Sequence, residues 1–236
     1  MRAGSVDYSS PMSTAPPSQT PAPATSGPSF YRWLIMALGI FLALLVLYRI
    51  TDSPPQNSSR QGLPKMSSIP PFTLNERSGK AVTNADLAGK VWVADFVYTT
   101  CPGPCPLVTA EMAKIQQSVL GDPHVQLVTF TVDPQNDTPP VLAAYADKFH
   151  ADPNKWWFLT GPEKPLYNLI ENGFLQSVQD NRGQPAEPGQ YTVTHSTYFA
   201  LVDVNGNMRG VYRSQDSDEC KQMLSDITTL EREAGL

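Results

Sequence analysis

Two cysteines separated by three residues, Cys101 and Cys105, are the residues in this sequence best suited to carry chemistry. They stand in the sequence CPGPCP, after an apolar run and before a stretch with helical spacing. A residue that precedes proline is disfavoured in helical dihedral angles, so we expect a loop from Cys101 to Cys105 and a helix that begins at Pro106. Cys105 then lies at or beside the helix N-cap, where free amide groups and the helix dipole favour a thiolate.

Such a cysteine pair admits three roles. A structural disulfide is one, but it would close a very small loop, where a crosslink adds little stability. A redox-active dithiol without a metal is the second. A metal site, which can itself be redox-active, is the third and is favoured here. Two thiolates alone are an incomplete site for most metals, so a third ligand is expected.

His195 is the best candidate for this third ligand. His124 lies in a Gly-Asp-Pro-His turn and His150 ends a predicted helix, so both are expected to be structural or solvated. His195 stands in YTVTHS at the entry of a predicted strand, and in the fold deduced below this connection faces the cysteine loop. Two cysteines and a histidine suit Cu(I) and also Zn²⁺. Asp133 and Asp137 could complete a zinc site, but they are equally typical of turn and cap residues.

The elements that must position these residues form one α/β domain. A short hairpin is expected around Ser78-Gly79, and Asn205-Gly206 joins the two strands of a second hairpin. The remaining strands are expected at 91–98, 125–132 and 156–159, the helices at 106–120 and 139–149, and a last helix after a capping box at 216–219. Strand, helix, strand, helix, hairpin, helix is the order of a thioredoxin-like α/β domain. Cys220 is expected in the core, on an apolar face of the last helix.

Three segments of different composition precede this domain, which is expected to occupy residues 72–236. Residues 1–29 are rich in Pro, Ser and Thr and are expected to be a disordered tail. Residues 30–50 contain the uncharged run WLIMALGIFLALLVLY between Arg32 and Arg49, long enough with its flanks for a single transmembrane helix. No A-x-A cleavage site follows this run, which favours an anchor over a signal peptide. Residues 51–71 are polar and Pro-rich, as in a flexible linker.

The net charge of the chain argues against nucleic-acid binding. The chain has 17 Lys and Arg against 22 Asp and Glu, a net charge of −5 at pH 7. An acidic chain does not hold a polyanion by counterion release, so no nucleic-acid partner is expected. Three cysteines are also too few for a disulfide-dense scaffold.

Three motifs, in this order, resemble the Sco/SenC family: FVYTTCPGPCP at 96–106, TVDPQNDTP at 131–139 and YTVTHS at 191–196. The resemblance covers roughly residues 70–236. It implies a membrane-anchored, thioredoxin-like copper protein that assists assembly of the dinuclear copper centre of cytochrome c oxidase. By position, it makes Cys101, Cys105 and His195 the ligands of Cu(I) or Cu(II), and it places Asp133 and Asp137 beside them.

The resemblance also implies a location and partners. The N-terminus is expected in the cytoplasm and the domain outside, although the arginines that flank the apolar run do not fix this orientation. The absence of a transit-like presequence favours a bacterial cytoplasmic membrane and a periplasmic domain over the mitochondrial inner membrane and intermembrane space. The expected partners are the copper-bearing subunit of cytochrome c oxidase and other periplasmic copper chaperones or thiol oxidoreductases.

Two functions remain open from the sequence. The first is a copper metallochaperone rather than an enzyme, which holds copper when Cys101 and Cys105 are reduced and excludes it when they form a disulfide. The second is a thiol-disulfide oxidoreductase that reduces the cysteines of a cuproprotein through a mixed disulfide. Asn136, where the family usually has Arg, and Thr194, where Asp is common, depart from the pattern and bear on the affinity and redox behaviour of the site.

Overall fold

The computed structural model describes residues 29–51, 62–181, 193–194 and 197–236, and the chain divides into two compact units, 1–58 and 59–236. The described part of the first unit is the apolar helix α1 (Ser29–Thr51). Its window Tyr31–Tyr48 has a mean hydropathy of 2.0 and is fully exposed in the structure. By length and composition this helix can cross a membrane, so it fits the anchor expected at 30–50.

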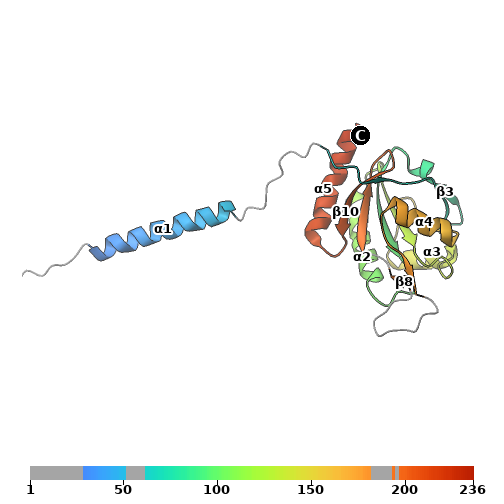
Figure 1. The fold of residues 1–236 in the computed structure, drawn as a ribbon, viewed down its shortest axis with the longest axis horizontal. Coiled ribbons are helices and arrows are strands. Elements are labelled where there is room, and N and C mark those ends of the chain that lie inside the picture. The colour runs from blue at the N-terminus through green and yellow to red at the C-terminus, as the bar shows by residue number, and fades with distance from the viewer. Residues whose placement is uncertain (1–28, 52–61, 182–192, 195–196) are drawn as a thin grey trace, which may run out of the picture. The chain divides into compact units, whose positions relative to one another are not determined.

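The second unit is built on a mixed sheet of eight strands in the order β1-β10-β9-β4-β5-β6-β2-β3 (Figure 1). The strands are β1 (Ser67–Ser68), β2 (Thr73–Glu76), β3 (Ala81–Thr83), β4 (Val91–Val97), β5 (Val125–Thr131), β6 (Trp156–Thr160), β9 (Tyr198–Val202) and β10 (Asn207–Arg213). The central strands β4, β5 and β6 are parallel, and the other pairs are antiparallel. A parallel centre extended by the final antiparallel hairpin is the arrangement that the sequence predicts.

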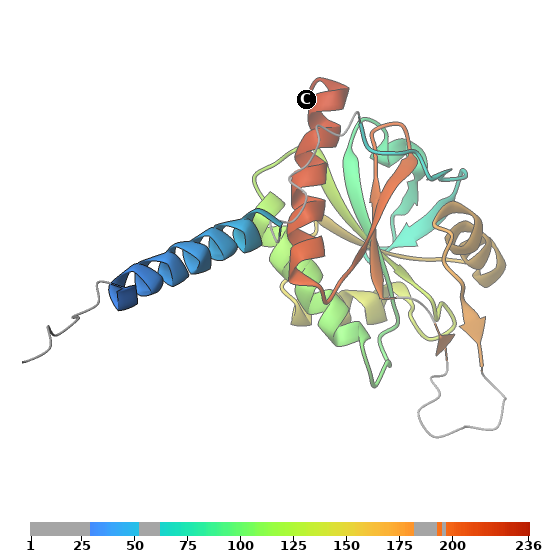
Figure 2. The same ribbon diagram turned by 60° about the vertical axis from the view of Figure 1, so that its left-hand side comes forward.

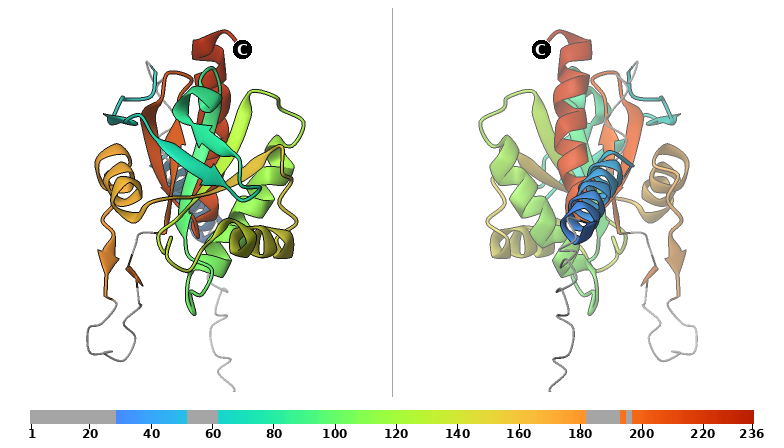
Figure 3. Two further views of the ribbon diagram at one scale, coloured as in Figure 1. Left: turned by 90° about the vertical axis from the view of Figure 1, so that its right-hand side faces the viewer. Right: turned by 90° about the vertical axis from the view of Figure 1, so that its left-hand side faces the viewer.

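Helices cover both faces of this sheet. They are η1 (Asn84–Leu87), α2 (Cys105–Val119), α3 (Pro139–Lys148), α4 (Glu163–Gly173) and α5 (Ser217–Ala234). A hydrogen bond of 2.9 Å between the hydroxyls of Thr109 and Tyr145 joins α2 to α3, and the Tyr145 ring also contacts Phe158 of β6. Helices α4 and α5 lie on opposite sides of the sheet (Figures 1 and 3). Because both faces are covered, every residue of β4 and of β5 is buried, as expected for central parallel strands.

An aromatic cluster fills the core on the α4 side of the sheet. The ring of Phe130 in β5 lies 5.9 Å from that of Phe96 and 5.3 Å from that of Phe174, which directly follows α4. Phe72 and Trp92 approach the same ring at 6.1 and 6.4 Å. These contacts fix β4 against β5 and α4, and they therefore hold the carboxyl ends of the parallel strands in place.

The folded unit begins earlier than residue 72, where the sequence analysis places the domain boundary. Leu63 and Ile69 are buried, and β1 pairs with β10. The Arg209 side chain donates from Nε to the Leu63 carbonyl at 2.9 Å and pairs with Asp203 and Glu233 at 2.8 and 2.9 Å. Two buried apolar residues and the partly buried Arg209 thus attach the described part of the expected flexible linker to the sheet.

A second, smaller sheet consists of β7 (Gln179–Asp180) and β8 (Val193–Thr194), which pair antiparallel. Its strand β7 extends away from the main sheet beyond α4 (Figures 2 and 3). Position 195 directly follows β8, and β9 begins at Tyr198. The short ladder therefore belongs to the connection that carries the predicted histidine ligand.

We expect Phe130→Ala to lower the free energy of unfolding by about 3–5 kcal/mol, because it removes a ring that is fully buried among four others. Urea denaturation of the detergent-solubilised chain, followed by tryptophan fluorescence, measures this loss. Leu120→Ala is the control, since Leu120 is 45% exposed at the end of α2 and its loss should cost less than about 1 kcal/mol. Equal losses for the two variants would contradict the central place of the aromatic cluster.

Candidate metal and thiol site

The cysteine loop connects the carboxyl end of β4 to the first turn of α2. Cys105 is the first residue of α2, one position before the predicted start, because Pro104 adopts helical dihedral angles (φ −75°, ψ −22°) and serves as the N-cap. The Cys101 amide donates to the Tyr98 carbonyl at 3.2 Å, which folds the loop into a turn. Both thiols are reduced, and they are 8% exposed at Cys101 and 0% at Cys105. The two sulfurs are thus brought together at one end of the sheet.

Burial governs the protonation of Cys105. Desolvation raises the pKa of the Cys105 thiol, and its hydrogen bond with Cys101 raises the pKa further. The backbone amide of Tyr98 acts in the opposite direction. The expectation that the helix N-terminus makes Cys105 a thiolate is therefore wrong for the metal-free reduced pair, because burial raises the pKa of this thiol.

Asp137 holds the start of the cysteine loop. Its buried carboxylate accepts hydrogen bonds from the amide and the hydroxyl of Thr99 at 3.1 and 2.5 Å. The hydroxyl of Thr131, the last residue of β5, donates to the same carboxylate at 2.5 Å. Asp137 thereby connects Thr99, two positions before Cys101, to the end of β5.

Asp133 closes the turn that follows β5. Its amide donates to the Thr131 hydroxyl at 2.9 Å, and its carboxylate accepts from the Asn136 side-chain amide at 2.7 Å. Asn136, one of the two departures from the family pattern, therefore takes part in the turn. In the metal-free chain, the hydrogen bonds of Asp133 and Asp137 hold the loops that follow β4 and β5. Their expected place beside the metal ligands stays a prediction.

His195, the predicted third ligand, lies outside the described residues, so its role stays a prediction. Thr194, the second departure, pairs with Gln179 in the β7–β8 ladder. After this connection the chain enters β9, which runs antiparallel to β4 with Ala200 opposite Ala94. The start of β9 therefore lies at the same end of the sheet as the cysteine loop. Within the described residues, no group of three His, Cys, Asp or Glu side chains could hold a metal ion.

The sequence analysis missed Asp95, a carboxyl group buried in the middle of β4. Its Oδ1 accepts a hydrogen bond of 2.5 Å from Thr129, which in turn accepts from the Trp156 indole at 2.8 Å. Among the residues that the structure describes, its Oδ2 is buried without a hydrogen-bond partner. Burial raises the pKa of Asp95 to about 7. An acidic residue inside the apolar run VWVADFV was the signal that could have revealed it.

A tyrosine and a threonine complete the polar groups beneath Cys105. The Thr109 hydroxyl donates to the Cys105 carbonyl at 2.9 Å and also contacts the Tyr145 hydroxyl. Burial raises the pKa of Tyr145, and negative charge on Cys105 and Asp95 raises it further. The first turn of α2 thus covers a small buried cluster of groups that carry protons.

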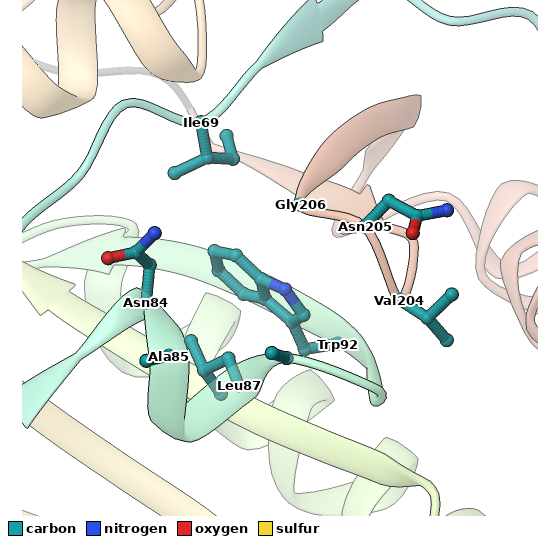
Figure 4. Close-up of a pocket in the computed structure, with 9 residues that line it drawn as sticks. Ile69, Asn84, Ala85, Leu87, Trp92, Val204, Asn205 and Gly206 are labelled. Atoms are coloured by element: carbon teal, nitrogen blue, oxygen red, sulfur yellow. The ribbon is translucent and has the colours of Figure 1, made fainter.

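Cys220 and several other features of the described residues lie outside this site. Cys220 is partly buried against the core, with its sulfur 3.4 Å from the Ser214 carbonyl. Trp156 is buried, whereas Trp157 is partly exposed and its ring lies 5.4 Å from the Lys90 ammonium. A pocket of about 290 Å³ opens over the Trp92 ring, between η1 and the β9–β10 turn (Figure 4). Trp92 is at the start of β4, so this pocket is at the opposite end of the strand from the cysteines.

Comparison with known proteins decides the family. The family model described as SCO1/SenC matches residues 60–231, which is most of the chain and all of the cysteine loop. The chain belongs to the SCO1/SenC family. The three motifs and the described geometry of the cysteine pair are therefore features of a Sco protein.

Solved Sco structures share this fold. A SCO1/SenC family lipoprotein from Bacillus anthracis is 34% identical, with a TM-score of 0.63, and the match covers 72% of this chain and 98% of that one. BsSco, described as a member of the Sco family of cytochrome c oxidase assembly proteins with a disulfide switch, is 27% identical over 72% and 98%, with a TM-score of 0.60. ScoI from Bradyrhizobium japonicum with copper bound is 26% identical over 70% and 99%, with a TM-score of 0.58. The predicted thioredoxin-like α/β fold is confirmed.

We expect Thr99→Val to loosen the cysteine loop, because it removes the 2.5 Å hydroxyl bond to Asp137 and leaves a buried carboxylate short of a donor. The free energy of unfolding should fall by about 1–3 kcal/mol, and alkylation of Cys101 by iodoacetamide should become faster. The adjacent, exposed Thr100 provides the matched control Thr100→Val. Equal alkylation rates in the two variants would show that Asp137 does not restrain the loop.

We expect Asp95→Asn to stabilise the chain more at high pH than at low pH. The folded pKa of about 7 exceeds the unfolded value of ~3.9, so the wild-type chain loses stability as pH rises from about 4 through 7. The variant has no such loss, and its advantage should grow by roughly 3 kcal/mol between pH 5 and pH 8, since the slope of 1.36 kcal/mol per pH unit holds up to about pH 7.

Urea denaturation of the wild type and Asp95→Asn at several pH values between 5 and 8 measures this difference. The exposed Asp86 has a lowered pKa, so Asp86→Asn should give a difference that is constant over this range. A constant difference for Asp95→Asn as well would contradict the raised pKa of Asp95.

Proposed function

We propose that this chain is a membrane-anchored copper-binding protein that assists assembly of the dinuclear copper centre of cytochrome c oxidase. The observation that carries this proposal is the pair of reduced cysteines, Cys101 and Cys105, on one restrained loop at the end of β4 in a Sco family domain. The copper-bound ScoI structure and the role described for BsSco support it. Copper is the cargo of this protein rather than a permanent cofactor.

The donor set fits copper. Two thiolates and one imidazole from Cys101, Cys105 and His195 combine soft and borderline ligands, which suit Cu(I) and are also compatible with Cu(II). The Cys105 thiol is protonated in the metal-free chain because it is buried. Copper binding must therefore displace thiol protons, and the affinity should fall as pH falls.

The thiol redox state gates this site. Oxidation of Cys101 and Cys105 to a disulfide removes two electrons and two protons and engages both sulfurs, so neither remains as a thiolate ligand. The hydrogen bond between the two thiols supports a gate of this kind, because it requires the sulfurs to be close together. The disulfide switch described for BsSco is the corresponding property of a relative.

Helix α1 anchors the chain in a bacterial cytoplasmic membrane, with the N-terminus in the cytoplasm and the Sco domain in the periplasm. The apolar window Tyr31–Tyr48 supports the anchor. The partner is the copper-bearing subunit of cytochrome c oxidase, and periplasmic copper chaperones or thiol oxidoreductases load or reduce the site. A mitochondrial inner membrane with the domain in the intermembrane space is the alternative location.

A second candidate function is reduction of the cysteines of a cuproprotein. The unequal exposure of the two thiols favours it, since Cys101 is 8% exposed and Cys105 is fully buried. Cys101 would attack the partner's disulfide and form a mixed disulfide, and Cys105 would then attack Cys101 and release the partner's second thiolate. Two electrons pass from the cysteine pair to the partner, and no metal is needed.

Anaerobic titration of the reduced full chain in detergent with Cu(I) separates the two functions. The copper-binding function predicts tight binding at one copper per chain, weakened at least tenfold in Cys105→Ser and in His195→Ala, because each variant removes a ligand. Cys220→Ser is the matched control and should bind as the wild type does. A weak wild-type site, together with a readily reduced Cys101–Cys105 disulfide, would reject copper carriage in favour of thiol reduction.

A test in cells addresses the physiological task. Deletion of the gene should lower cytochrome c oxidase activity, and copper added to the medium should restore part of it if the protein delivers copper. A purely thiol-reducing protein predicts no rescue by copper, because the target cysteines would stay oxidised. Restoration by the wild-type chain but not by His195→Ala would further support the role of the histidine.

A further inference from the structure

The two cysteines of the site are held by different parts of the fold. Cys101 belongs to the loop that follows β4. Asp137 fastens the start of this loop through its hydrogen bonds with Thr99 and Thr131. Cys105 is the first residue of α2, so its position depends on how the first turn of this helix is held. A disulfide requires the two sulfurs to approach in a narrow range of geometries, so both attachments must be precise.

The first turn of α2 lacks the side-chain cap that commonly fixes a helix start. Pro104 is the N-cap residue, its side chain has no hydrogen-bond acceptor, and the turn contains no acidic residue. The amides of Leu107 and Val108 donate to the Pro104 carbonyl at 2.9 and 3.0 Å, but these bonds stay within the turn. Helix ends fray, so another element is needed to hold the turn in place.

A pair of buried hydroxyl groups connects this turn to α3. The Thr109 hydroxyl donates to the Cys105 carbonyl at 2.9 Å, and the Tyr145 hydroxyl lies 2.9 Å from Thr109 Oγ1. A hydroxyl group has a single proton, so Thr109 accepts a hydrogen bond from Tyr145 while it donates to Cys105. Both side chains are buried, and linked hydrogen bonds in a buried place strengthen one another. The two bonds therefore form one chain from α3 to the backbone of Cys105.

Tyr145 is itself fixed against the sheet. Its ring lies 5.1 Å from the ring of Phe149 in the segment after α3 and 6.4 Å from that of Phe158 in β6. Phe158 lies opposite Thr129 of β5, and β5 pairs with β4. Cys105 is thus attached to the same sheet that holds the cysteine loop, through contacts that do not involve Asp137.

We propose that Tyr145 is a positioning residue for the cysteine pair: through Thr109, it holds Cys105 where its sulfur can bond to that of Cys101. The proposal rests on the proposed function only in treating Cys101 and Cys105 as the working pair. Tyr145 acts through the backbone of the first turn and exchanges no proton with the sulfurs. Without its hydroxyl, the turn gains freedom that disulfide formation must remove again, so the disulfide forms less readily.

The thiol-disulfide equilibrium with glutathione measures this effect without copper. The full chain in detergent is used, with a metal chelator and with Cys220→Ser in every variant, so that only the loop thiols react. One glutathione disulfide oxidises Cys101 and Cys105 to a disulfide and is reduced to two glutathione thiols, which takes up two electrons and two protons. Alkylation of the remaining thiols and mass spectrometry give the oxidised fraction at each glutathione ratio, and hence the equilibrium constant.

We expect Tyr145→Phe to lower this equilibrium constant about fivefold, which corresponds to about 1 kcal/mol for one hydrogen bond. The variant keeps the ring and removes only the hydroxyl. Thr109→Val should have the same effect, whereas Thr109→Ser keeps the hydroxyl and should keep the wild-type value. The double variant with Tyr145→Phe and Thr109→Val should lose no more than either single variant, because both substitutions break one chain.

Tyr212→Phe is the matched control. Tyr212 is also 6% exposed, and its hydroxyl donates to Asp226 at 2.7 Å, between β10 and α5. This variant should lower the urea midpoint as Tyr145→Phe does, but it should keep the wild-type equilibrium constant. A merely structural role of Tyr145 predicts an unchanged constant as well, because a loss of stability shared by the reduced and oxidised chains does not shift their equilibrium.

An unchanged or larger constant in Tyr145→Phe, or an equal fall in Tyr212→Phe, overturns the proposal. Additive falls in the double variant overturn the connection through Thr109. Because no copper is present, failure of this test leaves the copper titration unaffected, and failure of copper binding leaves this result intact.

Discussion

The hydrogen bonds that Asp137 accepts from Thr99 and Thr131 are the interaction on which the position of the cysteine loop depends. Thr99 follows the end of β4 by two residues and Thr131 is the last residue of β5, so one carboxylate joins the exits of two parallel strands. The cysteine loop contains Pro102 and Pro104, which limit its backbone but offer no amide donor to fasten it. Without Asp137, the prolines would shape the loop but would not attach it to the sheet.

Attachment of this loop to the sheet also explains why the cysteines are buried. Once Cys105 begins α2, the helix must pack on β4 and β5, and the first turn covers the sulfur. Burial raises the pKa of Cys105, which protects the thiol from adventitious metals and oxidants but slows its own chemistry.

The sequence predicts the framework of this fold well and the polar interior of the site poorly. Runs rich in apolar, β-branched and aromatic residues mark β4 and β5, because both faces of these central strands are buried and no alternation with polar residues is needed. The predicted domain boundary at residue 72 is too late, because Leu63 and Ile69 are buried in the folded unit. In the sequence they are separated mainly by polar residues and Pro64, a composition that resembles a linker. The prediction of a thiolate at Cys105 is wrong because burial raises the pKa of this thiol. That burial depends on how α2 packs, which the local sequence does not describe.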